Sequence, residues 1–455
     1  MSTTTPKISE AAARGYRVPP NSPWARAWRI PACAAALGFG IAAIGLWKEP
    51  DRFPFSYLFG FFVALSLAVG SIFFVLVLYV TKASWGITVR RVAELFMRPM
   101  ALFAFLVVPL VLLPRFGNVN PDPINRLFPW SSANEVAASA EAPLFEARGL
   151  AEREPAAMRD LPVASPQSMQ RADEGVEASI IDHKRLYLNR YFFLGRLILY
   201  LGIWTVIAHF YFGWSTDQDT SKAPSLTATA QRFTPLAIIG FALSLSFFAF
   251  DWLLSLDATW YSTIFGVYVF AQCALFQMAS LIVMTLALRK SGLLGNAVNV
   301  EHFHDLGKLL FGWIAFWTYI SFAQFFLTWY SNIPDEVAWF HKRWDGNGGD
   351  WMYVSVALVG LHFFVPFWFL MSRNVKRRLP FLATGAVCLI VMHITEAYWI
   401  IFPNFGPFAP DLLDFGCLIG IVGAYLAAVL RGMTDYALVP VGDPRLARAL
   451  EFENA

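Results

Sequence analysis

The sequence predicts an all-α polytopic membrane protein with about ten transmembrane helices. Ten apolar runs follow one another along the chain, and a helix needs about 20 such residues to cross the roughly 30 Å hydrocarbon core of a bilayer. The runs lack the two-residue alternation of a barrel strand, so each must close its backbone hydrogen bonds as a helix. Composition agrees, because 57% of the residues are hydrophobic and 15% are charged, against about 25% charged in soluble domains.

The predicted spans form two membrane regions separated by one long polar segment. Three spans occupy 30–114 and seven occupy 191–433, between a polar tail at 1–29 and another at 434–455. The first tail is long for a signal peptide, so we expect the first span to be retained. The third span is short and carries Pro109, so two alternatives stay open: a kink at the proline, or a span that leans on its neighbours. In chain order the spans are 30–47, 55–80, 99–114, 191–212, 234–255, 261–289, 309–330, 353–371, 379–400 and 412–433.

Lys and Arg residues set the expected orientation. If the N-terminus faces the cytoplasm, the short outer turns hold only four of them, and the inner turns and tails hold many more. Positive charge collects on the cytoplasmic side of membrane proteins, and an even number of spans then places both termini in the cytoplasm. The outer four are Lys48, Arg52, Lys342 and Arg343, and the inner ones include Lys82, Arg90, Arg91, Arg98, Arg373, Lys376, Arg377 and Arg378.

The segment 115–190 differs from the rest of the chain. It is rich in Ala, Glu, Arg and Pro, and its eleven acids and nine bases make it too polar to enter lipid. The predicted topology places it outside the cytoplasm, as a long periplasmic loop. Two interpretations stay open: a disordered surface loop, or a docking element that becomes ordered against an external partner.

Cysteine usage and net charge argue against several classes of site. Cys33, Cys273, Cys388 and Cys417 all lie inside apolar runs, and the chain has no CxxC or CxxCH motif. Iron–sulfur, zinc and covalent haem c sites in this chain are therefore not expected. The formal net charge of +3 is too small to suggest a nucleic-acid partner.

Several spans carry polar side chains, and a charged residue at the centre of a membrane helix costs about 2.5–3.5 kcal/mol. His393 and Glu396 are three residues apart, so both project from one face of the ninth span. Trp317 and Gln324 share a face of the seventh span, which we expect to look into the bundle. The candidates for a proton path are Asp251, Gln324, His393 and Glu396 in the outer half, His362 about midway, and His209, Gln277, Ser280 and Tyr319 nearer the cytoplasm.

Beside proton transfer, three interpretations of these residues stay open. They can form interhelical hydrogen bonds, worth about 0.6 kcal/mol each, which is favoured for any single Ser, Thr or Gln. For Asp251, and for His393 with Glu396, a function is favoured, because a carboxylate beside an imidazole can pass protons. Haem ligation by His362 and His393 is weaker, since the spans hold only three histidines. A secondary transporter is the third, although no span shows the repeated Gly/Pro-broken centre typical of that class.

Three segments resemble a known family. They read HDLGKLLFGWIAFWTYISFAQFFLTWYSNIPDEVAWF at 304–340, FDWLLSLDATWYSTIFGVYVF at 250–270 and VMHITEAYWIIFP at 391–403. They are similar to the NrfD-like (polysulfide-reductase-like) membrane subunits of alternative complex III, a bacterial quinol:electron-acceptor oxidoreductase. The string FAQFFLTWYSNIPDE is the most specific element, and the resemblance covers spans two to ten. That complex has two such membrane subunits, and the chain resembles the smaller one.

The resemblance implies two four-helix bundles, spans two to five and six to nine, with the first and last spans at the periphery. It implies a multi-pass protein of the bacterial cytoplasmic (inner) membrane. The implied partners are the homologous larger membrane subunit, a periplasmic iron–sulfur protein, c-type cytochrome subunits and lipids. In that family the larger membrane subunit holds the quinol, other subunits hold haem c and iron–sulfur clusters, and the smaller membrane subunit holds no redox cofactor. The segment 115–190 departs from the pattern by its length and its Ala/Glu content.

The leading hypothesis is a cofactor-free, non-catalytic membrane subunit of a quinol-oxidising respiratory or photosynthetic complex, with two polar half-paths for protons. One alternative is direct quinol binding, with His393 or Asp251 as proton acceptor beneath Trp329 or Tyr398, because quinol oxidation needs a base within hydrogen-bond reach. The other alternative is an independent secondary transporter.

Overall fold

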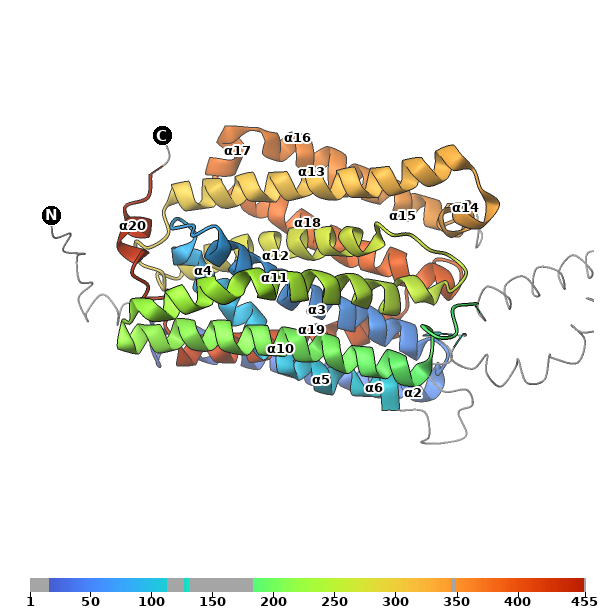
Figure 1. Cartoon of the computed structure of the whole chain (residues 1–455), viewed down its shortest axis with the longest axis horizontal. Helices are drawn as coiled ribbons and strands as arrows, with labels where there is room; N and C mark the ends of the chain where they lie inside the picture. The colour runs from blue at the N-terminus through green and yellow to red at the C-terminus, as the bar shows by residue number, and fades with distance from the viewer. Residues whose placement is uncertain (1–15, 113–126, 129, 131–182, 345–348, 454–455) are drawn as a thin grey trace, which may run out of the picture.

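Long helices that run side by side make up the whole described structure (Figure 1). The computed structural model describes residues 16–112, 127–128, 130, 183–344 and 349–453. Within these ranges the chain forms no β-strand, and ten helical segments are long and apolar enough to cross a membrane. The predicted all-α polytopic membrane fold is confirmed.

The ten spans lie close to the predicted positions, and several extend by one or more turns beyond the apolar run. They are α2 (Arg29–Lys48), α3 (Phe53–Val80), the broken span α4 (Ile87–Met97), η2 (Arg98–Ala101), α5 (Leu102–Leu106) and α6 (Val108–Leu112), then α10 (Arg190–Ser221), α11 (Pro224–Trp252), α12 (Phe265–Lys290), α13 (Val300–Ser331), the span α15 (Trp351–Ala357), η6 (Leu358–Phe364) and α16 (Val365–Met371), then α18 (Leu379–Ile401) and α19 (Leu412–Asp435). Short helices connect or flank them: η1 (Pro23–Arg26), η5 (Leu254–Leu256), α14 (Pro334–His341), α17 (Arg373–Arg377), η7 (Phe402–Asn404) and α20 (Leu446–Leu450).

The helices group as the two predicted bundles. The first contains α3, the broken span α4 to α6, α10 and α11, and the second contains α12, α13, the span α15 to α16, and α18. The two bundles meet where α3 packs on α12. A Cβ on Gly70 of α3 would lie 2.3 Å from the carbonyl oxygen of Cys273, so only glycine permits this close backbone approach.

The first and last spans lie outside the two bundles, as predicted. α2 packs mainly against α19, which in turn packs against α3. The two helices cross at small residues, because a Cβ on Gly38 would lie 2.3 Å from the backbone nitrogen of Gly420. Half of the residues of α2 are exposed, and most of these are apolar, which is typical of a helix that faces lipid.

The third span is the main correction to the predicted boundaries. Its helix begins at Ile87 rather than at residue 99. Arg90 and Arg91, which we expected in an aqueous turn, are fully buried. Glu94 pairs with both guanidinium groups at 2.8 Å, so the helical turn carries its own counter-charge. Val107 interrupts the helix just before Pro109, in agreement with a kink at the proline.

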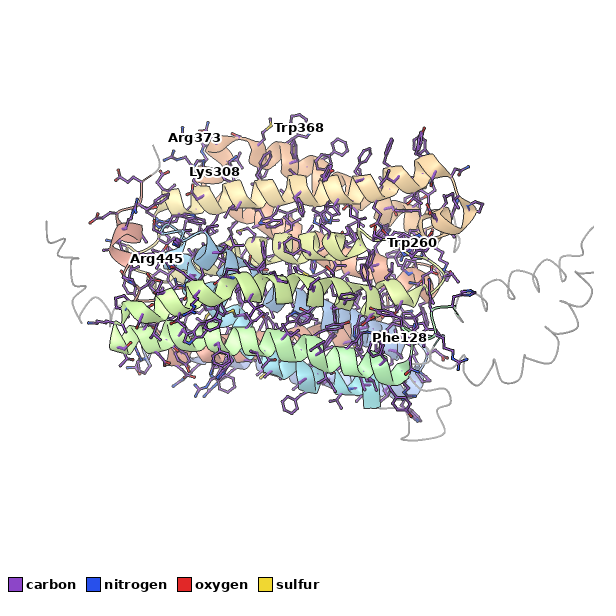
Figure 2. The ribbon with its side chains drawn as sticks, in the orientation of Figure 1. Phe128, Trp260, Lys308, Trp368, Arg373 and Arg445 are labelled. Atoms are coloured by element: carbon purple, nitrogen blue, oxygen red, sulfur yellow. The ribbon has the colours of Figure 1, made fainter. Side chains whose placement is uncertain are left out.

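The two described ends of the chain meet at one end of the molecule, here called the N/C end. The backbone N–H of Leu438 donates to the carbonyl oxygen of Tyr16 at 2.8 Å, and α20 lies at the same end (Figure 1). Figure 2 shows Lys308, Arg373 and Arg445 toward this end and Trp260 toward the other. This agrees with the charge bias that predicts a cytoplasmic location for the N/C end, which stays a prediction.

Most of the predicted loop 115–190 lies outside the described residues, so its order and its partner stay predictions. Its described parts pack at the end opposite the N/C end. Trp130 is buried and donates its indole N–H to the carbonyl oxygen of Ser255 at 3.2 Å, and Phe128 contacts the ring of Trp252. Lys184 donates to the carbonyl oxygen of Ala258 at 2.5 Å.

Candidate functional site

A buried carboxylate in the second bundle forms the centre of the candidate site. Glu396 lies on α18 and has no exposed surface. Its Oε1 accepts a hydrogen bond from the hydroxyl of Tyr268 on α12 at 2.5 Å and one from Nε1 of Trp317 on α13 at 2.8 Å. Three helices of one bundle therefore fix a single carboxylate oxygen.

The second oxygen of this carboxylate faces a histidine. Oε2 of Glu396 lies 3.6 Å from Nδ1 of His362, which is too long for a hydrogen bond. Oε2 and both ring nitrogens of His362 have no hydrogen-bond partner among the described residues. The carboxylate is thus held on one side and open to proton exchange on the other.

His362 occupies an irregular part of its span. Residues Leu358–Phe364 form a π-helical turn, η6, between α15 and α16. Pro366 follows four residues after His362; it lacks an N–H and its ring crowds the carbonyl of the fourth residue before it, which explains the local widening. The imidazole is buried and lies flat against the indole of Trp317, with ring centroids 4.0 Å apart. Such π-helical turns are frequent at functional sites.

His393 lies on α18 one turn before Glu396, and both side chains are buried as their three-residue spacing predicts. Its ring stacks on Phe276 of α12, with centroids 4.2 Å apart and planes 12° apart. Neither ring nitrogen has a hydrogen-bond partner among the described residues. Its polar edge is therefore available to a proton or a polar group.

Three buried amide side chains lie on helices of the same bundle. Gln272 of α12 lies beside Tyr268 and Glu396 but meets neither in hydrogen-bond geometry. Within the described structure Gln277 and Gln324 are buried, and each leaves one amide atom without a partner. Buried polar atoms are normally paired in proteins, and leaving one unpaired costs about 1–3 kcal/mol. These unpaired atoms are therefore candidates for a functional role.

Sequence reasoning missed two members of the site. Tyr268 lies inside one of the family-like segments but received no role there, and Gln272 was not among the candidates. Both could have been found by helical spacing, because 268, 272 and 276 lie on one face of α12. The prediction that Trp317 looks into the bundle is confirmed, since it is buried together with Gln324.

Asp251 does not belong to this site, which corrects the predicted outer path. The guanidinium of Arg196 donates to both oxygens of the Asp251 carboxylate, at 2.7 Å from Nε and 2.9 Å from Nη2. The hydroxyl of Tyr200 also donates to this carboxylate, at 2.7 Å. The guanidinium also lies 4.0 Å from the ring centroid of Tyr187. Asp251 is therefore the acidic half of a closed ion pair between α10 and α11, in the other bundle.

The predicted inner path is not assembled either. Tyr319 and His209 are exposed on the outer surface of the described structure, and Ser280 is half-buried. Tyr319 follows Trp317 by two residues, which turns it about 200° around the helix, so burial of Trp317 directs Tyr319 outward. Of the inner candidates, Gln277 alone is fully enclosed.

The residues named for the alternatives also have defined places. Tyr398 donates to Asp414 at 3.2 Å in a cluster with Arg52, and Trp329 is exposed at the end of α13. Neither covers the site as a lid. The described residues contain no group of three or more His, Cys, Asp or Glu side chains that could hold a metal ion. Haem ligation by His362 and His393 stays a hypothesis.

Comparison of the sequence with protein-family models and with curated proteins finds no match in either case.

Proposed function

We propose that this integral membrane protein is a subunit of a quinol-oxidising electron-transfer complex and that the buried site on α18 handles protons for it. The specific proposal is the smaller NrfD-like membrane subunit of alternative complex III, ActF. The observation that carries the proton role is Glu396, with one carboxylate oxygen held by two donors and the other left facing His362 at 3.6 Å.

The three family-like segments support the link between site and complex. Segment 250–270 supplies Tyr268, segment 304–340 supplies Trp317, and segment 391–403 supplies Glu396. Residues far apart in the sequence thus converge on one carboxylate. A functional site shared with the family would explain why these three segments are the ones that resemble it.

Proton transfer needs a donor and an acceptor within reach and a weak hold on the moving proton. The fixed Oε1 keeps the carboxylate in place, and the unpaired Oε2 can take or release a proton without breaking another hydrogen bond. The proposed route continues through His362, His393 and Gln272, and Gln277 lies further along α12 toward α3. The route in this proposal runs through that bundle and leaves out Asp251, His209 and Tyr319.

Under this proposal the chain binds no cofactor of its own. Electrons pass through haem c and iron–sulfur clusters in partner subunits, and quinol binds to the homologous larger membrane subunit. Quinol binding at the Glu396 site is the less favoured function, because Glu396, His362 and His393 are each at most 1% exposed. A quinone ring needs an opening to the lipid that these side chains do not have.

Two experiments test the proposal. Affinity purification of the tagged chain from its native membrane should recover haem c and iron–sulfur absorbance; recovery of the chain alone would favour a transporter. In the purified complex, Glu396→Gln should lower the number of protons moved per quinol oxidised, whereas Tyr319→Phe, on the exposed face of α13, should leave that ratio unchanged. An unchanged ratio in Glu396→Gln at normal turnover would remove Glu396 from the path.

A further inference from the structure

A cavity of about 500 Å³ opens on the surface of the first bundle, and none of its lining residues belongs to the Glu396 site. It lies between the η2 turn and α10, and Tyr436 after α19 closes it at the N/C end. From these elements and their chemistry we infer that this cavity binds the head group of an anionic phospholipid.

Arg98 supplies the positive charge of the cavity. Its guanidinium lies 5.2 Å from the ring centroid of Tyr436 and 5.7 Å from that of Phe212. These two rings meet edge to face at 4.9 Å and form a platform for the cation. Arg98 lines the cavity and its side chain makes no hydrogen bond or ion pair with any residue that the structure describes, and its Nη1 lies beside Gly432 of α19.

The lining favours an anion. None of the side chains that line the cavity is acidic, and the nearest acids in sequence, Asp217 and Asp435, do not contribute to it. The other nitrogen-bearing side chain is His209 of α10, exposed toward the same opening. An arginine without a counter-ion, set on aromatic rings, is a strong partner for a phosphate oxygen.

The shape favours a lipid over a small soluble anion. The lining residues of α10 run from Thr205 to Thr216, a length of about 16 Å at 1.5 Å per residue. Arg98 and Tyr436 mark the polar end, near the polar last turns of α10. At the other end Thr205 is followed by Val206, an exposed apolar side chain of the same helix. The ligand must therefore be anionic at one end and apolar at the other.

Gly213 makes room for this ligand. Gly213 lines the cavity, and a Cβ at this position would meet no atom within 4 Å because it would stand in the open space. Basic cavities between helices at the cytoplasmic surface are a recurrent way of holding anionic head groups. The predicted cytoplasmic location of the N/C end agrees with that pattern.

Lipid binding to the purified full-length chain in detergent tests this inference. Native mass spectrometry should show phosphatidylglycerol retained in preference to phosphatidylcholine with the same acyl chains. Arg98→Gln should weaken retention of phosphatidylglycerol about tenfold, as expected for the loss of one charge-assisted contact. Arg232→Gln is the matched control, because Arg232 is an exposed arginine near the start of α11 that does not line the cavity.

A second variant fills the cavity and leaves the charge of Arg98 in place, so its result does not depend on whether Arg98→Gln folds normally. Gly213→Leu should fill the cavity and reduce lipid retention, whereas Gly195→Leu should not, because Gly195 is an equally open glycine of α10 outside the cavity. Equal retention in wild type, Arg98→Gln and Gly213→Leu would overturn the inference. Displacement of the lipid by inorganic phosphate, or by a neutral short-chain quinone, would also overturn it in favour of a different ligand.

Discussion

The imidazole of His362 lies against the indole of Trp317, with ring centroids 4.0 Å apart and planes inclined by 25°. The same indole donates its N–H to Glu396. One side chain therefore positions both members of the 3.6 Å pair between His362 and Glu396. Its ring and its N–H act on different partners, so their contributions can be separated by substitution.

Trp317→Phe should keep the ring that supports His362 and remove the donor to Glu396. We expect a loss of about 1–2 kcal/mol in stability, because a hydrogen bond to a buried carboxyl group is removed, and slower proton movement at unchanged quinol affinity. Trp313→Phe is the matched control, one turn earlier on α13 and without a hydrogen bond to Glu396. Thermal unfolding in detergent and proton-release rates measure the two effects, and equal behaviour of the two variants would contradict the positioning role.

Asp251→Asn should damage the fold rather than the proton path. The substitution leaves Arg196 buried without its counter-charge, and breaking a buried pair in this way costs about 3–5 kcal/mol. We expect a lower unfolding temperature and a lower yield of folded protein, with a normal proton ratio in the molecules that fold. Asp217→Asn, on the exposed face of α10, serves as control. A stable Asp251→Asn protein with a reduced proton ratio would return Asp251 to the path.

Some features of this structure could be predicted from local sequence and others could not. Span number, the burial of His393 with Glu396 and the kink at Pro109 follow from periodicity and from proline chemistry, which act locally. Which bundle interior a polar side chain points into depends on the rotation of its helix, and the local sequence constrains that rotation only weakly. For this reason the sequence groups Tyr319 and Asp251 with residues that they do not meet in the structure.

Charge pairing caused a different kind of miss. Arg90 and Arg91 look like residues of an aqueous turn until their partners are known. Glu94 is close in sequence, but Asp219 and Asp443 come from distant parts of the chain. Long-range pairs of this kind leave no local signal.

The protein should lose stability as pH falls below 4 because of Asp443, which lies outside the spans in the C-terminal segment. Burial alone would raise its pKa, but Arg90 at 2.7 Å and Arg445 at 3.1 Å outweigh burial and lower the pKa to about 2. The folded pKa is below the unfolded value of about 3.9. The stabilisation, about 2 kcal/mol, is therefore complete above pH 4 and lost as pH falls toward 2.

The variant Asp443→Asn checks this pH dependence. At pH 7 it should unfold at a lower temperature than wild type, and the gap should narrow steadily between pH 4 and pH 2. Glu451→Gln, an exposed acid of the same segment, should show no such change. A gap of constant size across that range would mean that Asp443 contributes through packing alone.

The crossing of α2 and α19 should depend on glycine at one position and not at another two residues away. A Cβ on Gly38 would lie 2.3 Å from the backbone nitrogen of Gly420 and 2.6 Å from the carbonyl oxygen of Gly416, whereas a Cβ on Gly40 would meet no atom within 4 Å. Gly38→Ala must separate the two backbones, and overpacking of this kind costs about 1–3 kcal/mol. Gly40→Ala should be neutral or stabilising by up to about 1 kcal/mol, since alanine has the higher helix propensity. The unfolding temperatures of the two variants in the same detergent test this prediction. Equal shifts would mean that the close contact between α2 and α19 at Gly38 does not stabilise the protein.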